Sequence, residues 1–320
     1  MDDFDVRLAS PAIFHFDPRY EQMRTQNIVP TYRVFGRHRR DQSQLLSLPD
    51  EILWRITHFI AAIERGRFLS QFALAHRKCR QLVRPHHFAD MFITRSEKSW
   101  KFLRHLLREA RKAKTEPAGW CPGPSIAESI RSITIFVDDQ PCVDYCCSSD
   151  KEYEQWRKHW QPLINALSQA VKSAMPNLER VFWRETGDLN MQPRLLKAVL
   201  EHSSSESGRM HELALTDFKF CFYEELEQVL VSIPSRPIRL RSFALGEDED
   251  GAESRDGCAA YLAENILRSS APTMETCGWN SKFDGRLCSE DFDDGRIWFR
   301  DGPIEFRKLR KFWGRISGMK

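Results

Sequence analysis

The stretch Ser47-Leu48-Pro49-Asp50-Glu51-Ile52-Leu53-Trp54-Arg55-Ile56 predicts a short helix near the start of the chain. Pro49 falls in the first turn, where its missing N–H leaves no helical hydrogen bond unmade. Asp50 and Glu51 follow at once, where the helix dipole favours negative charge. Apolar residues then recur at helical spacing. We expect them to form one apolar face, made of Ile52, Leu53, Ile56, Phe59 and Ile60.

A second helix is predicted over residues 68–83. Its apolar residues are Phe72, Leu74, Ala75, Cys79, Leu82 and Val83. Two short helices this rich in apolar residues cannot bury them on each other alone, because a unit of about forty residues has too little interior. The pair therefore needs a partner surface.

The two helices together resemble an F-box. That family pairs a Leu-Pro-x-Glu-(Ile/Leu)-Leu helix with a later helix reading apolar-x-Leu-Val-Cys-Lys-Arg-aromatic-Arg-x-Leu-Val, and residues 72–83 follow this register. His76 and Cys79 depart from it, since Cys and an aromatic residue are usual there. The resemblance implies that the chain binds the Skp-type adaptor of a ubiquitin ligase, and through it cullin and RING subunits. The adaptor contacts that it implies are Leu48, Pro49, Glu51, Ile52, Leu53, Ile56, Leu74, Leu82 and Val83. An ordinary helix hairpin is the alternative.

The composition excludes several classes of protein. Hydrophobic residues are 41% and charged residues 29% of the 320, which is too apolar for general disorder. The nine cysteines are odd in number, without framework spacing, and the start of the chain does not read as a signal peptide. We therefore expect reduced thiols and a cytoplasmic or nuclear protein. Cys142, Cys146 and Cys147 lack the paired spacing of a zinc site, so neither a metal nor a cofactor is expected. No apolar run is long enough for a membrane span.

The pattern apolar-x-x-apolar-x-apolar recurs through the rest of the chain. It starts at Ile130, Leu178, Met210, Leu240 and Met274, with a degenerate copy at Leu309. The later starts are separated by 32, 30, 34 and 35 residues, which is the spacing of a repeat protein. Helical patterns fill the gaps at about 153–174, 193–202, 223–232 and 258–269. Each unit is therefore predicted to be a strand followed by a helix.

These units resemble the irregular, long leucine-rich repeats that commonly follow an F-box. The resemblance implies an α/β chain: a small all-α F-box domain, then a curved solenoid with parallel strands inside and helices outside. Another parallel α/β layer is the alternative. The expected domains are an N-terminal extension (1–42), an F-box-like domain (43–93), a basic helical linker (94–125) and the repeat domain (126–320). Asp301-Gly302 adds a hairpin signal within the last of these.

Strand alternation assigns the third, fifth and seventh positions of each repeat to the concave face. Aromatic and Arg side chains dominate interface hot spots. The substrate-binding candidates are therefore Arg180, Phe182 and Arg184, with Glu212 and Thr216 on the next repeat. A strand face that simply contacts solvent is the alternative.

Two basic stretches stand out against a net charge of only +3. They are residues 33–40 and 95–114, the second with a helical apolar stripe. Either could contact nucleic acid. Interleaved aromatic residues and a known binding motif are both missing, so we favour a solvated linking helix and do not expect nucleic acid as a partner.

No motif of a hydrolase nucleophile, a phosphate-binding loop or a dinucleotide site is present. We therefore expect a non-catalytic subunit of a ubiquitin ligase, which holds an unknown protein substrate. A nucleic-acid-associated basic module and a ligase-independent, adaptor-binding scaffold are the alternatives.

Overall fold

The computed structural model describes residues 44–63, 67–94, 96–115, 125–137, 150–185, 193–216, 237–246, 258–281, 296–299 and 302–316. The predicted extension 1–42, helix 223–232 and cysteine cluster 142–147 lie outside these residues. The chain divides into two compact units, Met1–Phe92 with Ala118–Ile130, and Ile93–Pro117 with Arg131–Lys320. The segment expected to be a linker, 94–125, is thus shared between the two units.

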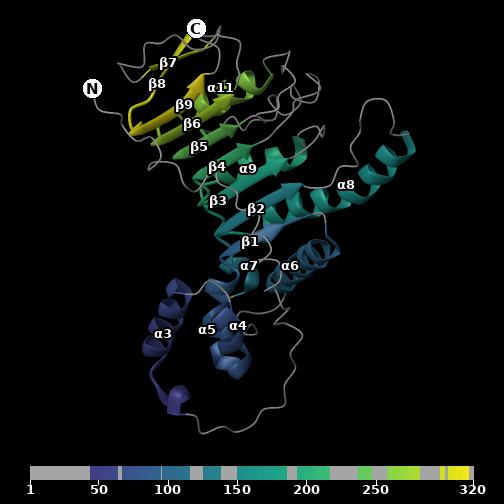
Figure 1. The fold of residues 1–320 in the computed structure, drawn as a ribbon, viewed down its shortest axis with the longest axis vertical. Helices are drawn as coiled ribbons and strands as arrows, with labels where there is room; N and C mark the ends of the chain where they lie inside the picture. The colour runs from purple at the N-terminus through teal and green to yellow at the C-terminus, as the bar shows by residue number, and fades with distance from the viewer. Residues whose placement is uncertain are drawn as a thin grey trace. The chain divides into compact units, whose positions relative to one another are not determined.

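The first unit is built from helices (Figure 1). A 3₁₀ turn, η3 (Gln44–Ser47), precedes α3 (Asp50–Ile63), α4 (Arg67–Ala75) and α5 (Arg77–His87), and the short α7 (Ile126–Ser129) comes from later in the chain. As predicted, α3 has Asp50 and Glu51 in its first turn. The Pro49 carbonyl accepts the amides of Ile52 and Leu53 at 3.0 and 3.1 Å. A small core links these helices: Leu69, Ala73 and Val83, with Ile60, Ala61 and Phe72 packed against it.

The single helix predicted over 68–83 is wrong, because α4 and α5 are separated at His76. The backbone of His76 is extended, with φ −159° and ψ 158°, and its Nδ1 accepts the amide of Lys78 at 3.1 Å. This ring nitrogen takes the place of a backbone acceptor and caps α5. The hydrophobic periodicity does not predict this break, because apolar residues recur at helical spacing on both sides of it. Lys78 also forms an ion pair of 2.6 Å with Asp50 at the start of α3.

The second unit is an α/β layer. Its strands β2 (Ser132–Val137), β3 (Arg180–Glu185), β4 (Glu212–Thr216), β5 (Ser242–Gly246), β6 (Thr276–Ser281) and β9 (Lys311–Ile316) pair in parallel in this order. β1 (Asp90–Ile93), in which the division between the units falls, is the first strand in the order of the same sheet. The helices α8 (Asp150–Ser173), α9 (Pro193–Ser204) and α11 (Cys258–Ser270) lie along one side of this sheet (Figure 1). α6 (Glu97–Thr115) packs against α8.

The strands of successive repeats pair in a single register. The fourth residue of each copy is the partner of the fourth residue of the next, in the series Ile133, Val181, Leu213, Phe243, Cys277 and Phe312. The first five of these are fully buried. The residue before each strand extends the pairing, since the Arg131 carbonyl accepts the amides of Glu179 and Arg180 at 2.7 and 3.0 Å. The predicted strands and their parallel pairing are confirmed.

Four short elements remain among the described residues of the two units. β7 (Arg296–Phe299) and β8 (Gly302–Glu305) pair antiparallel as a separate two-stranded sheet, which confirms the predicted hairpin. α7 and β1 have no counterpart in the sequence-based prediction, because four-residue elements are too short to show a period. In α7, Ser125 and Glu128 form a reciprocal capping box, with bonds of 3.0 and 3.2 Å.

Candidate functional site

The first unit exposes large apolar side chains on its helices. Phe59 is 65% exposed, Trp54 and Leu74 are each 50% exposed, and Ile52 is 40% exposed. Leu45 and Phe68 are also exposed, so all the exposed large apolar residues among the described ones fall within residues 45–75. Single exposed apolar residues are ordinary, but such a concentration on one small unit makes it a candidate for an interaction surface.

The single apolar face predicted for α3 is in fact two faces. Leu53 points inward and is fully buried, as is Thr57, whose hydroxyl donates to the Leu53 carbonyl at 2.8 Å. Ile52 and Phe59 point outward. Successive helical residues lie about 100° apart, so Leu53 can face the interior while Ile52 lies at the exposed side of the helix. The outer stripe, Ile52, Ile56 and Phe59, has the spacing i, i+4, i+7.

The predicted adaptor contacts are divided between the surface and the core. Pro49, Glu51, Ile52 and Leu74 are exposed, and Leu48, Ile56 and Leu82 are half-buried. Leu53 and Val83 lie in the interior, where they support the surface from beneath instead of forming part of it. Cys79, one of the two departures from the F-box pattern, is buried as well, and burial raises the pKa of its thiol.

An aromatic cluster joins α3 to α5. Trp54 stacks on His58, with ring centroids 5.5 Å apart and planes at 11°, and His86 lies 5.6 Å from His58. The Nε2 atom of His86 is buried without a hydrogen-bond partner. Desolvation, and then the charge of His58, lower the pKa of His86. The i, i+4 spacing of Trp54 and His58 is a signal in the sequence, but nothing there indicates that His86 joins them.

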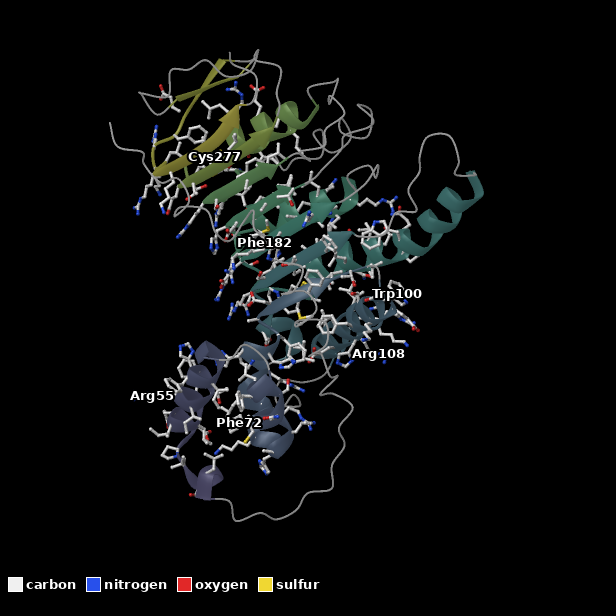
Figure 2. All side chains as sticks on the ribbon, viewed as in Figure 1. Arg55, Phe72, Trp100, Arg108, Phe182 and Cys277 are labelled. Carbon is white, nitrogen blue, oxygen red and sulfur yellow. The ribbon has the colours of Figure 1, made fainter. Side chains whose placement is uncertain are left out.

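Strand pairing brings the five substrate-binding candidates together on β3 and β4. Arg180 is the register partner of Glu212, and Arg184 is the partner of Thr216. Phe182, which is labelled in Figure 2, lies between the two arginines in the sequence of β3. All five side chains are half-buried.

Arg184 is held by a further contact on this face. Its guanidinium lies 5.5 Å from the ring centroid of Phe136 on β2. A cation–π contact of this kind contributes about 0.5–1 kcal/mol at an exposed site. The sequence placed Phe136 on the same face, and the parallel register brings it beside Arg184.

Most of the rest of the predicted concave face, as far as the structure describes it, is closed, although Ser242 and Thr276 are half-buried like the five candidates. Ser132 and Thr134 on β2 are buried, as are Ala214 and Ala244 on β4 and β5. Alternation itself holds, but short side chains between strands about 4.8 Å apart leave little room for water. The candidate surface is therefore narrower than the sequence suggested, and it centres on β3 and β4.

Within the described residues, no three His, Cys, Asp or Glu side chains come close enough together to bind a metal ion. None of the helices described there has the length and apolar character needed to cross a membrane.

Comparison with known proteins gives no match: no protein-family model and no curated protein matches the chain. The features that indicate a function are therefore the exposed apolar residues of the first unit and the half-buried residues of β3 and β4.

Proposed function

We propose that the chain is an F-box substrate receptor of a Skp/cullin/RING-type ubiquitin ligase. In this proposal the first unit docks the Skp-type adaptor, which in turn joins cullin and RING subunits. The second unit holds a target protein. The chain supplies no catalytic group, because holding the target near a ubiquitin-loaded enzyme raises the effective concentration of the reacting groups.

The exposed apolar surface of the first unit carries this proposal. Ile52 and Leu74 occupy positions to which the F-box pattern assigns adaptor contacts, and both are exposed. Burial of one large apolar side chain contributes about 1.5–3 kcal/mol. A partner that covers several of them gains enough free energy to offset the loss of its translational and rotational freedom.

The second unit is, in the same proposal, a leucine-rich-repeat-like solenoid. Six strands that follow one sequence pattern and pair in one register support it. Such an array presents neighbouring strands as a continuous binding face. Arg180, Phe182 and Arg184 are then the central target contacts, with Glu212 and Thr216 beside them.

The docking step is tested with Ile52→Asp in the full-length chain, co-expressed with a Skp-type adaptor. Ile52 is exposed, so the unit keeps its fold, while a carboxylate in an apolar interface has no partner and must be desolvated. We expect the adaptor to be lost from the purified material. Gln169→Asp places the same carboxylate on an exposed position of α8 and should retain the adaptor.

Two results would contradict the docking step: a wild-type chain that captures no adaptor, or an Ile52→Asp variant that captures as much as the wild type. A complex that binds adaptor but no cullin would instead identify a ligase-independent scaffold.

A further inference from the structure

Helix α6 presents two opposite faces. Phe102, Leu103, Leu106 and Leu107 are buried in the second unit, in which α6 packs against α8. The outward face bears the α6 basic stripe, which we define as Lys101, Arg104, Arg108 and Arg111, all exposed. Their spacing of three, four and three residues places them in one row. Trp100 and Arg108 are labelled on this helix in Figure 2.

The charge of α6 is concentrated and only partly compensated. The helix has seven Lys and Arg residues and two Glu residues, a net charge of +5, whereas the whole chain carries +3. Lys101 pairs with Glu97 at 2.7 Å. Arg104 lies over the Trp100 ring, 5.9 Å from its centroid, so its charge stays on the surface. No carboxylate of the described residues pairs with Arg104 or Arg108. Like charges at this spacing destabilise a helix by a few tenths of a kcal/mol per pair. The row of basic residues therefore does not stabilise α6.

We propose that the α6 basic stripe binds the phosphate backbone of a nucleic-acid duplex. The four cations extend over about 15 Å, since each residue adds about 1.5 Å to a helix. One strand of a duplex places a phosphate at about every 3.4 Å of its axis, so about four phosphates lie along the same length. The helix backbone is already ordered, so binding to a regular polyanion restricts only the Lys and Arg side chains.

The same residues argue against two other anionic partners. Arg is also common in protein interfaces, but there it stands beside aromatic or apolar anchors, and the stripe contains none. Insertion into a membrane surface would need the apolar face of the helix, and that face is buried. The lack of interleaved aromatic residues counts against single strands, whose bases stack on such residues, but not against a duplex held by its backbone.

The test is fluorescence anisotropy of a labelled 20-base-pair DNA duplex, and of an RNA duplex of the same length, with the full-length chain at 50–200 mM salt. Four phosphate contacts predict that log K falls with log salt with a slope of about −3.6, or roughly 150-fold over this range. Arg104→Gln with Arg108→Gln should halve the slope, so that the loss falls to roughly 12-fold. Arg194→Gln with Arg209→Gln removes the same charge from exposed positions elsewhere and should leave the slope unchanged.

Circular dichroism and thermal melting confirm that both variants are folded. The proposal is overturned if neither duplex binds at 50 mM salt, or if the α6 variant binds with the wild-type slope. It is overturned as well if poly-glutamate or vesicles rich in anionic lipid bind the chain and the duplexes do not. Binding of DNA without RNA, or the reverse, supports it and names the duplex.

Discussion

His76 ends one helix and begins the next through its own side chain. The imidazole Nδ1 accepts the Lys78 amide, one of the donors that the start of α5 would otherwise leave without a partner. A residue that caps a helix in this way fixes the point at which the chain turns. The relative direction of α4 and α5, and therefore the position of Leu74, depends on it.

Replacing this cap should destabilise the first unit by a measurable amount. We expect His76→Ala to lower the free energy of unfolding by about 1 kcal/mol, because the Lys78 amide loses its acceptor. His76→Asn retains a side-chain acceptor and should lose much less. Urea unfolding followed by circular dichroism measures both. Equal stability of the alanine variant and the wild type would show that the cap has no energetic role.

Three histidines make the fold sensitive to acid. Burial lowers the pKa of His86, His87 and His202 from the ordinary value of 6.5. In the folded chain they therefore stay neutral at a pH where the unfolded chain has already taken up protons. The contribution of these neutral histidines to the free energy of unfolding should be fully present above about pH 7. It should decrease as the pH drops through 6.5 and below.

Urea midpoints at pH 7.5 and pH 5.5 check this expectation. His86→Phe keeps a ring beside Trp54 and His58 but does not titrate, so it should reduce the difference between the two midpoints. A midpoint that rises at pH 5.5 would contradict the assignment of these histidines as buried and neutral.

The turn between α9 and β4 requires glycine at one position. A Cβ atom added at Gly208 would lie 1.9 Å from the carbonyl oxygen of His202, which is backbone and cannot rotate away. The His202 carbonyl also accepts the amide of Ser205, and the Ser203 hydroxyl donates to the Met210 carbonyl at 3.1 Å. The turn therefore sets where β4 begins.

Gly208→Ala should destabilise the second unit by about 1–3 kcal/mol, the usual range for overpacking. Arg209→Ala, at the exposed neighbouring position, serves as the matched control and should change stability by less than about 0.5 kcal/mol. Thermal melting distinguishes the two variants. If Gly208→Ala melts with the wild type, the backbone has more room there than its contacts indicate.

The elements that sequence could predict are those whose period is repeated. Ile133, Val181 and Leu213 each lie in a copy of one sequence pattern. Side chains alternate between the two faces of a strand, so only one alignment of the strands buries all three residues. The strand register could therefore be predicted from the sequence. The helix break at His76 could not be predicted from the sequence, because histidine is not a common helix-capping residue. The two faces of α3 were missed for another reason, since apolar residues around most of a helix do not reveal which of them contact a partner.

The candidate surfaces were predictable to different degrees. The residues on β3 and β4 came from alternation, and the structure keeps them together. The burial of Ala214 and Ala244 could not be foreseen, because it depends on neighbours that sequence distance does not show. Trp54, His58 and His86 were missed as a group, since their contact joins two helices.

The units of the whole chain are not continuous in sequence. Ala118–Ile130 belongs with the first helices, whereas Ile93–Pro117, which contains α6, belongs with the sheet. The sequence-based division instead assigned residues 94–125 to one linker and residues 126–130 to the repeat domain. Each segment belongs to the unit in which its apolar side chains are buried. Leu103 and Leu106 of α6 and Ile126 of α7 are all interior residues. The basic helix is therefore a fixed part of the second unit, with its charged side outward.

Docking of the adaptor by the first unit is tested most directly by titrating purified Skp-type adaptor into the purified full-length chain in a calorimeter at several temperatures. The proposal predicts a one-to-one complex with a negative heat-capacity change, because Ile52, Phe59 and Leu74 leave water on binding. No binding at any temperature, or binding that Ile52→Asp leaves unchanged, would contradict it.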